Sequence, residues 1–442
     1  MKKNFISLRV LPVFFVLVMV FGIISMMSVT ASAAVVNYDE RASAQSSVSR
    51  VSVDTSKNFY LVKNKATVRS STGLFYQKVA TLYSGTLVQV SGQKSDYYTV
   101  RYSINNKNVT YYIKKSELKA APKSLSSYGF LYTSKDARAL RQAPCSEGTK
   151  TNLPKGTLLL DFGKLCNSAG NIWHVVYRSG KLFFIYEENV EAFERITLKL
   201  EGPALMKTHT GTYDFNVSVS PRALTGITFS TSDKAIANVN GKGRVSLPGG
   251  AGDVTVSAEL DGIAKVSVTS TVMIDLDTYE QTTNYTCGAA SILTVARNSG
   301  KLLGKKDTQI YNAAASESVI VNTLNKNLGT GTYVNKKVKS CGLAEYERII
   351  RNSLRQGSPV ILLISFNKQY FAYATNAGSG HYVTVIGLVE DENGTVWAIL
   401  ADSFAHRFKS TVYSDKASGY VKVPLSKLYE YGKTKKSMIY NP

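Results

Sequence analysis

GITFSTSDKAIANVNGKGRVSLPGGAGDVTVSAELDGIAKVSVTSTV, residues 226–272, alternates apolar and polar side chains between glycine and aspartate turns. The turns recur about every eight to twelve residues, which is the spacing of short strands in a β-sandwich. Residues 213–221, YDFNVSVSP, alternate in the same way. We therefore expect a β-rich domain over residues 196–272.

Two upstream blocks, residues 59–120 and 128–195, share one order of features. Each has an arginine-bearing opening strand, a Gly-Thr entry to a second strand, an aromatic-rich third strand and a tyrosine in the closing strand. The strand lengths and turn signals are those of a small barrel. The repetition indicates an internal duplication.

The pattern changes over residues 273–442. Helical periodicity appears over residues 289–296 and again over 343–354, and glycines follow both stretches. Three apolar β runs come next, PVILLISF, HYVTVIGLVE and TVWAILADSF, and the turn signal DENG separates the last two. This order predicts an α+β domain.

The N-terminus reads as a secretory signal peptide over residues 1–33. A basic start precedes a long apolar run, and Ala-Ser-Ala at residues 31–33 is a typical cleavage site. An uncleaved membrane anchor is the alternative, because the apolar run is about long enough to span a bilayer. Residues 34–58 are serine-rich and alanine-rich and predict a linker.

The 442 residues carry a formal net charge of +22. Such a charge favours polyanionic partners, and for a secreted protein these are anionic wall polymers and lipid surfaces. The alternative is that the lysines only keep sheets soluble and protect their edges. The basic residues are spread along the chain and no nucleic-acid motif is present, so we expect no nucleic-acid partner.

The chain has four cysteines and no Cys-x-x-Cys pair, so we expect neither a metal nor an organic cofactor. Cys145 and Cys166 lie in the same predicted β block and could pair. Cys287 begins the helical stretch at residues 289–296, where a helix N-terminus stabilises a thiolate. The alternative for Cys287 is a small buried apolar residue.

A nucleophilic cysteine needs a base, and His381 opens a β run after a glycine-rich segment. Asp402 ends the next run. Two registers of the connecting hairpin place His381 and Asp402 on the same face at the same end of the sheet, within reach of a hydrogen bond. A bulge would break this inference.

Gln281, six residues before Cys287, supplies an amide that could stabilise an oxyanion together with the backbone N–H of Cys287. Cys341 also precedes a helix but has no glutamine at a similar distance, so we interpret it as structural or free. His406 follows in the next loop without an acidic partner, and we interpret it as a surface or core histidine and not as the base.

The stretches EQTTNYTCGAASILTVARNSG, GSGHYVTVIGLVE and WAILADSF resemble a papain-like cysteine peptidase of the bacteriocin-processing, double-glycine type. The resemblance covers about the last 170 residues. It implies Cys287 as nucleophile, His381 as general base and acid, Asp402 as its orienting partner and Gln281 as oxyanion donor. Leader-processing relatives are fused to membrane-spanning transporter domains that this sequence lacks.

The two upstream blocks resemble bacterial SH3-like domains, and TSDKAIANVNGKGRVS with GAGDVTVSA resembles a bacterial immunoglobulin-like domain of group 2. These resemblances imply wall attachment and a stalk. The expected fold class is therefore multidomain: two SH3-like β-barrels, one Ig-like β-sandwich and a C-terminal α+β papain-like domain.

The sequence as a whole predicts a secreted or surface-bound bacterial cysteine peptidase. Its substrate would be a protein or the stem peptides of peptidoglycan, and its β modules would bind the wall. The two alternatives are a non-catalytic adhesion protein and a thiol acyltransferase, in which an amine rather than water captures the thioester.

Overall fold

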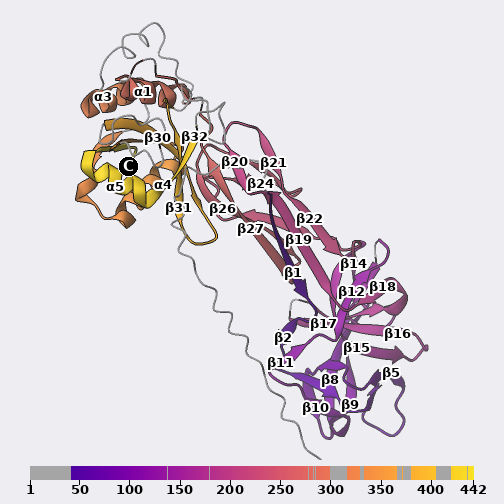
Figure 1. Ribbon diagram of the computed structural model, residues 1–442. Coiled ribbons are helices and arrows are strands. Elements are labelled where there is room, and N and C mark those ends of the chain that lie inside the picture. Colours follow the sequence, from indigo (N-terminus) through magenta and orange to yellow (C-terminus); the bar gives the residue numbers. More distant parts are fainter. Residues whose placement is uncertain are drawn as a thin grey trace, which may run out of the picture.

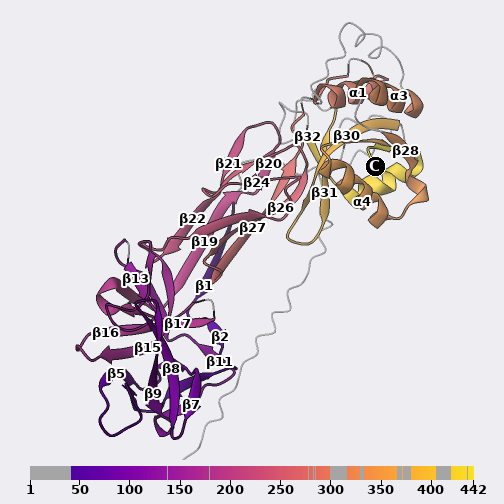
Figure 2. The same ribbon diagram turned by 180° about the vertical axis from the view of Figure 1, so that it is seen from behind.

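The structure is a computed structural model that describes residues 41–136, 138–178, 180–276, 278–281, 283, 285–298, 316–328, 333–365, 371, 380–404, 420–435 and 437–442. The predicted signal peptide and His406 lie outside these residues. The molecule is elongated, with the N-terminal β modules at one end and the helices at the other (Figure 1). The reverse view shows the same arrangement (Figure 2).

A β-sandwich forms the middle of the molecule, as the alternation over residues 226–272 predicts. One of its sheets has the order β1-β19-β22, a second has the order β20-β27-β26-β23, and a short third has the order β21-β25-β24. Its strands are β1 (Arg41–Val48), β19 (Ile196–Pro203), β20 (Leu205–Lys207), β21 (Thr212–Asp214), β22 (Asn216–Ser220), β23 (Ile227–Thr231), β24 (Asn238–Val239), β25 (Arg244–Ser246), β26 (Gly252–Leu260) and β27 (Ala264–Met273).

Strand β1 corrects the expected linker over residues 34–58. Residues 41–48 pair antiparallel with β19 along their whole length, from Arg41 opposite Pro203 to Val48 opposite Ile196. Small side chains alternate toward the sandwich core in this strand. The two duplicated blocks are therefore inserted between two neighbouring strands of the sandwich.

The two duplicated blocks do not form two separate barrels. β5 of the first block pairs with β15 of the second, and this pairing joins most of their strands into one twelve-stranded sheet. The first block contains β3 (Phe59–Val62), β4 (Lys65–Arg69), β5 (Lys78–Tyr83), β6 (Leu87–Gln89), β7 (Gly92–Lys94), β8 (Tyr97–Ile104), β9 (Lys107–Lys114), η1 (Lys115–Glu117) and β10 (Leu118–Ala120).

The second block follows a short pairing of β2 (Ser52–Asp54) with β11 (Ser124–Ser126). It contains β12 (Gly129–Thr133), β13 (Arg138–Arg141), β14 (Lys150–Leu153), β15 (Leu158–Asn167), β16 (Ile172–Arg178), β17 (Lys181–Tyr186), η2 (Glu187–Asn189) and β18 (Val190–Phe193). Buried residues of both blocks and of the sandwich form one continuous apolar cluster.

The C-terminal region is built on a six-stranded sheet of order β28-β33-β29-β30-β31-β32. Helices α1 and α4 lie where the sequence periodicity predicts helices. The elements are α1 (Cys287–Asn298), α3 (Glu317–Leu328), β28 (Val334–Lys337), η4 (Val338–Ser340), α4 (Leu343–Arg355), β29 (Val360–Ser365), β30 (Gly380–Glu390), β31 (Val396–Ala401), β32 (Tyr420–Pro424), α5 (Leu425–Lys435) and β33 (Ser437–Tyr440).

The fold class expected from the sequence is wrong. The expected α+β papain-like domain gives way to a mostly β, sandwich-rich architecture, with 52% strand against 16% helix over the described residues. The separate SH3-like barrels likewise give way to the joined sheet. The physical reason is that local periodicity identifies single helices and strands, whereas pairing between distant strands decides the architecture.

The sandwich and the C-terminal sheet share a core. Met273, at the end of β27, belongs to the same buried cluster as the central residues of β30 and β31. The backbone N–H of Ile274 donates to the carbonyl of Ile386 in β30 at 2.8 Å. The junction therefore fixes one end of the sandwich to the strand that carries His381.

Candidate active site

Helix α1 begins at Cys287. The carbonyl of Thr286 accepts a hydrogen bond from the backbone N–H of Ala290 at 2.9 Å, and the Thr286 hydroxyl lies within 3.3 Å of both the N–H and the carbonyl of Thr283. The hydroxyl thus bonds back into the preceding loop, and the carbonyl of Thr286 starts the helix. These contacts place Cys287 in the first turn of α1.

The Cys287 side chain is mostly buried, with 8% of its surface exposed. It packs in an apolar cluster with Tyr382 of β30 and Ile361 of β29. Burial raises the pKa of the Cys287 thiol, the backbone N–H groups of Tyr382 and Gly288 lower it, and the carboxylate of Asp402 raises it again. The sulfur therefore lies beside the backbone of the residue that follows His381, and within electrostatic reach of Asp402.

His381 and Asp402 form a buried pair. Nε2 of His381 lies 2.8 Å from Oδ1 of Asp402, and the two side chains are 1% and 0% exposed. The same carboxylate oxygen accepts the backbone N–H of Phe404 at 2.9 Å, and the Phe404 ring meets the imidazole edge-on. The pair has the geometry of a base and the carboxylate that orients it.

A β-bulge makes this pairing possible. Next to the turn, Glu390 lies opposite Val396 and Gly387 opposite Ile399, and that register would put Asp402 opposite Thr384. Beyond the bulge the register shifts by one, so that Thr384 lies opposite Ala401. Because a one-residue shift exchanges the two faces of a sheet, the bulge turns Asp402 to the face of His381.

The sandwich packs directly against the bulge. The carbonyl of the bulged residue, Ile386, accepts the N–H of Ile274. A Cβ at the next residue, Gly387, would lie 2.9 Å from the Cβ of Met273, so a larger residue at this position would force the two strands apart. The end of β27 therefore fits the irregular part of β30 closely.

Burial acts on both members of the pair. It lowers the pKa of His381, because the imidazolium would be unhydrated, and it raises the pKa of Asp402 for the same reason. The bond from the imidazole N–H favours the ionised carboxylate. At neutral pH His381 is therefore an uncharged imidazole, as a general base must be.

Gln281 lies beside this pair but is held by its own bonds. Its backbone N–H donates to the carbonyl of Ser403, its side-chain oxygen accepts the Ser403 hydroxyl at 2.9 Å, and its amide nitrogen donates to the carbonyl of Thr283 at 2.9 Å. One amide N–H is therefore used within the loop, and the second has no partner among the described residues. The loop links the segment before Cys287 to the residue after Asp402.

Sequence reasoning missed two residues of this site. Ser403 anchors Gln281, and Tyr382 presents its backbone N–H to the thiol. Ser403 follows Asp402 directly in the motif ADSF, so its place beside the site could have been predicted from the sequence. Backbone groups such as the Tyr382 N–H leave no signal in a sequence.

The competing residues lie elsewhere. Cys341 donates its S–H to the carbonyl of Val338 at 3.2 Å, just before α4, as expected for a structural cysteine. Cys145 and Cys166, which could have paired, are free thiols in the structure. Among the described residues, no group of three His, Cys, Asp or Glu side chains is placed to hold a metal ion.

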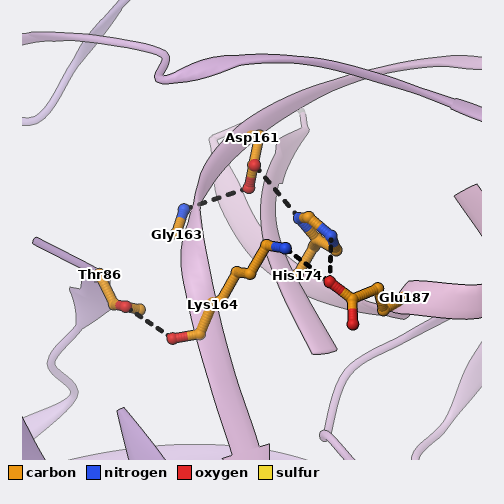
Figure 3. A network of polar contacts seen from close by, with 6 residues as sticks. All are labelled: Thr86, Asp161, Gly163, Lys164, His174 and Glu187. Carbon is orange, nitrogen blue, oxygen red and sulfur yellow. Dashed lines mark hydrogen bonds and ion pairs between the residues drawn. The ribbon is translucent and has the colours of Figure 1, made fainter. Parts of the chain in front are cut away.

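His174, a second buried histidine, has a different environment (Figure 3). Its Nδ1 lies 3.1 Å from Oδ2 of Asp161 and its Nε2 lies 3.8 Å from Oε1 of Glu187, which also binds Lys164 at 2.5 Å. The carbonyl of Lys164 accepts the hydroxyl of Thr86 in the first block at 2.8 Å. The side-chain network lies within the second block, the Thr86 bond links the blocks, and both imidazole nitrogens face carboxylates.

No family model matches the chain, and no curated protein matches it. Solved structures give distant likenesses. A crystal structure of the intimin–Tir90 complex is 15% identical, with a TM-score of 0.16, and the match covers 33% of this chain and 72% of that one. A crystal structure of an intimin mutant from EHEC O157:H7 is 16% identical, with a TM-score of 0.15, over 41% and 86%. At these TM-scores neither likeness defines the fold of this chain.

Proposed function

We propose that the C-terminal region is a cysteine hydrolase that cleaves peptide amide bonds through a thioester on Cys287. One observation carries the proposal: His381, buried and bonded to Asp402, lies on β30 directly before Tyr382, and Tyr382 packs in the same cluster as Cys287. A cysteine at a helix start, an imidazole and an orienting carboxylate are the parts that thiol acylation requires.

The proposed reaction has two stages, acylation of the thiol and hydrolysis of the thioester. Nδ1 of His381, on the side of the ring away from Asp402, takes the thiol proton while the sulfur attacks the carbonyl carbon. The C–S bond forms, the C–N bond breaks, and the amine leaves with the proton from the imidazolium. Water, deprotonated by His381, then attacks the thioester, releases the acid and returns the proton to the sulfur.

The raised pKa of Cys287 changes one step of this scheme. Because burial keeps the thiol protonated at neutral pH, proton transfer to His381 accompanies the attack instead of preceding it. The backbone N–H groups around the sulfur, together with the second amide N–H of Gln281, are the candidate donors to the oxyanion.

The same proposal includes a location at the outside of a bacterial cell. The signal-peptide pattern at residues 1–33 supports secretion. The β modules would hold the enzyme at the cell envelope, where proteins and peptidoglycan stem peptides are both within reach. No helix among the described residues is long and apolar enough to cross a membrane.

Alkylation of the mature protein with iodoacetamide, followed by peptide mapping, tests the catalytic part. We expect Cys287 to react faster than Cys341, and the His381→Ala variant to remove that difference. Cys341 is the internal control, because it is also buried and its pKa is also raised by burial. Equal, slow labelling of both thiols, rising only above pH 9, would refute an activated centre.

The burial of Cys287 favours one rival, a non-catalytic adhesion protein that retains the pair as a structural element. Incubation with a peptide library and with peptidoglycan stem peptides separates the two. Cleavage products that gain the mass of water support hydrolysis, and products joined to an added amine support acyl transfer. An intact library together with unreactive Cys287 supports adhesion.

A further inference from the structure

The first β block, residues 59–120, exposes an unusual loop between β4 and β5. Over the described residues only eight large apolar or aromatic side chains are strongly exposed, and three of them are consecutive. Leu74 is 92% exposed, Phe75 100% and Tyr76 39%. Loop tips are normally polar, and clustered exposed apolar side chains mark interaction sites.

Hydrogen bonds at the base of the loop hold it closed, so the side chains at its tip stay in solvent and do not fold back onto the block. The backbone N–H of Ser70 donates to the carbonyl of Gln77 at 3.0 Å, and the N–H of Gln77 donates to the Ser70 hydroxyl at 2.8 Å. The Arg69 guanidinium stacks over the Tyr76 ring at 4.9 Å. These contacts close the loop below Leu74 and Phe75 and leave both of these side chains without packing.

Positive charge is concentrated in the same block. Residues 59–120 contain eight lysines and two arginines but only one aspartate and one glutamate, whereas residues 128–195 are nearly balanced. Lys78 lies opposite Arg69 at the foot of the loop, and Lys94 stacks over Tyr112, the neighbour of Arg69 on β9. Two exposed lysines, Lys78 and Lys94, therefore lie near the base of the apolar tip.

We propose that this loop docks the protein on an anionic lipid surface, with Leu74 and Phe75 inserted at the level of the headgroups and the lysines against the phosphates. Apolar side chains below a basic rim are the features that interfacial membrane binding requires. A soluble anionic wall polymer could pair with the lysines, but it would not bury the two exposed apolar side chains. Because this block and helices α1 and α3 lie at opposite ends of the molecule, the docked protein would hold its helical end away from the lipid (Figure 1).

Vesicle flotation of the chain without residues 1–33 tests the proposal. We expect binding to vesicles of phosphatidylcholine with 30% phosphatidylglycerol, weakening with salt, and little binding to phosphatidylcholine alone. The double variant Leu74→Ser/Phe75→Ser should lose on the order of tenfold in vesicle affinity, since two apolar side chains no longer enter the interface. Val319→Ser, on exposed helix α3, is the matched control and should bind like the parent protein.

Fluorescence of a Phe75→Trp variant separates lipid from polymer. A blue shift with anionic vesicles and none with a soluble poly(glycerol phosphate) is the expected result. Unchanged vesicle binding of the serine double variant would overturn the proposal, as would a tryptophan that shifts with the polymer but not with vesicles. All three positions are exposed, so loss of folding does not explain a loss of binding.

Discussion

His381 and Asp402 are joined at 2.8 Å across neighbouring strands, although the register at the turn of their own hairpin would place them on opposite faces of the sheet. A single extra residue, Ile386, corrects the register between the turn and the pair. The end of the sandwich strand β27 packs against that residue and its neighbour Gly387. The sandwich thus takes part in setting the geometry of the candidate site.

Substitution of Gly387 tests this dependence. A Gly387→Ala side chain would lie 2.9 Å from the Cβ of Met273, and relief of that overlap costs about 1–3 kcal/mol and shifts the strand. We expect the rate of Cys287 alkylation and any hydrolytic activity to fall, together with a lower melting temperature.

A second substitution makes the Gly387 test specific. Met273→Gly removes the Cβ that causes the overlap and should restore part of the Cys287 reactivity in the Gly387→Ala background. Gly241→Ala, where the structure has open space, should change neither property. Normal reactivity in Gly387→Ala would show that the bulge does not position the pair.

Asp402→Asn should abolish most catalysis while the protein stays folded. The amide oxygen is a weaker acceptor than a carboxylate, and the amide NH2 can turn toward the ring and select the wrong tautomer of His381, so a loss of about 10²–10⁴-fold in kcat is expected. Glu392→Gln, in the exposed turn of the same hairpin, is the matched control and should retain full activity. Equal activity of both variants would remove Asp402 from the mechanism.

The pH dependence of stability separates the two members of the pair. In His381→Ala, Asp402 remains with a raised pKa, so the unfolded state binds fewer protons between about pH 4 and 7 and stability falls as pH rises through that window. In Asp402→Asn, His381 remains with a lowered pKa, so stability falls as pH drops below 6.5.

Urea midpoints between pH 4 and 8, taken as differences from the parent protein, measure both trends. In the parent protein the two contributions have opposite signs and partly cancel. The two variants should therefore diverge in opposite directions with pH, and parallel curves would show that the pair is not buried as described.

Removal of residues 41–48 should destabilise the sandwich, although the segment is rich in serine and alanine. A chain that begins at residue 49 lacks β1, which leaves β19 unpaired on one edge. We expect a lower melting temperature and fast hydrogen exchange at the β19 amides that point toward β1. A chain that begins at residue 40 is the control, and equal exchange in both chains would contradict the pairing.

The sequence predicts the local elements of this protein better than their assembly. The periodicity at residues 289–296 and 343–354 corresponds to helices α1 and α4, and the alternation at residues 226–272 corresponds to strands of the sandwich. The pairing of β5 with β15 and of β1 with β19 joins segments about 80 and 150 residues apart, and no local pattern specifies such partners.

In the candidate site too, the sequence predicts local features better than the contacts between distant segments. Hairpin geometry brings His381 and Asp402 to one face, as the alternation predicts, but the register that achieves this depends on a bulge that the sequence does not reveal. Gln281 lies next to Ser403, yet its amide is engaged with Thr283, a contact between loop residues that spacing alone cannot indicate.

The insertion of the two blocks between β1 and β19 has a mechanical consequence. Both polypeptide connections to the blocks leave the sandwich at one place, where Val48 lies opposite Ile196. Tension between the blocks and the C-terminal region would load β19 and, through eight residue pairs, β1 in shear. Antiparallel strands pulled in this direction share the force over many hydrogen bonds at once.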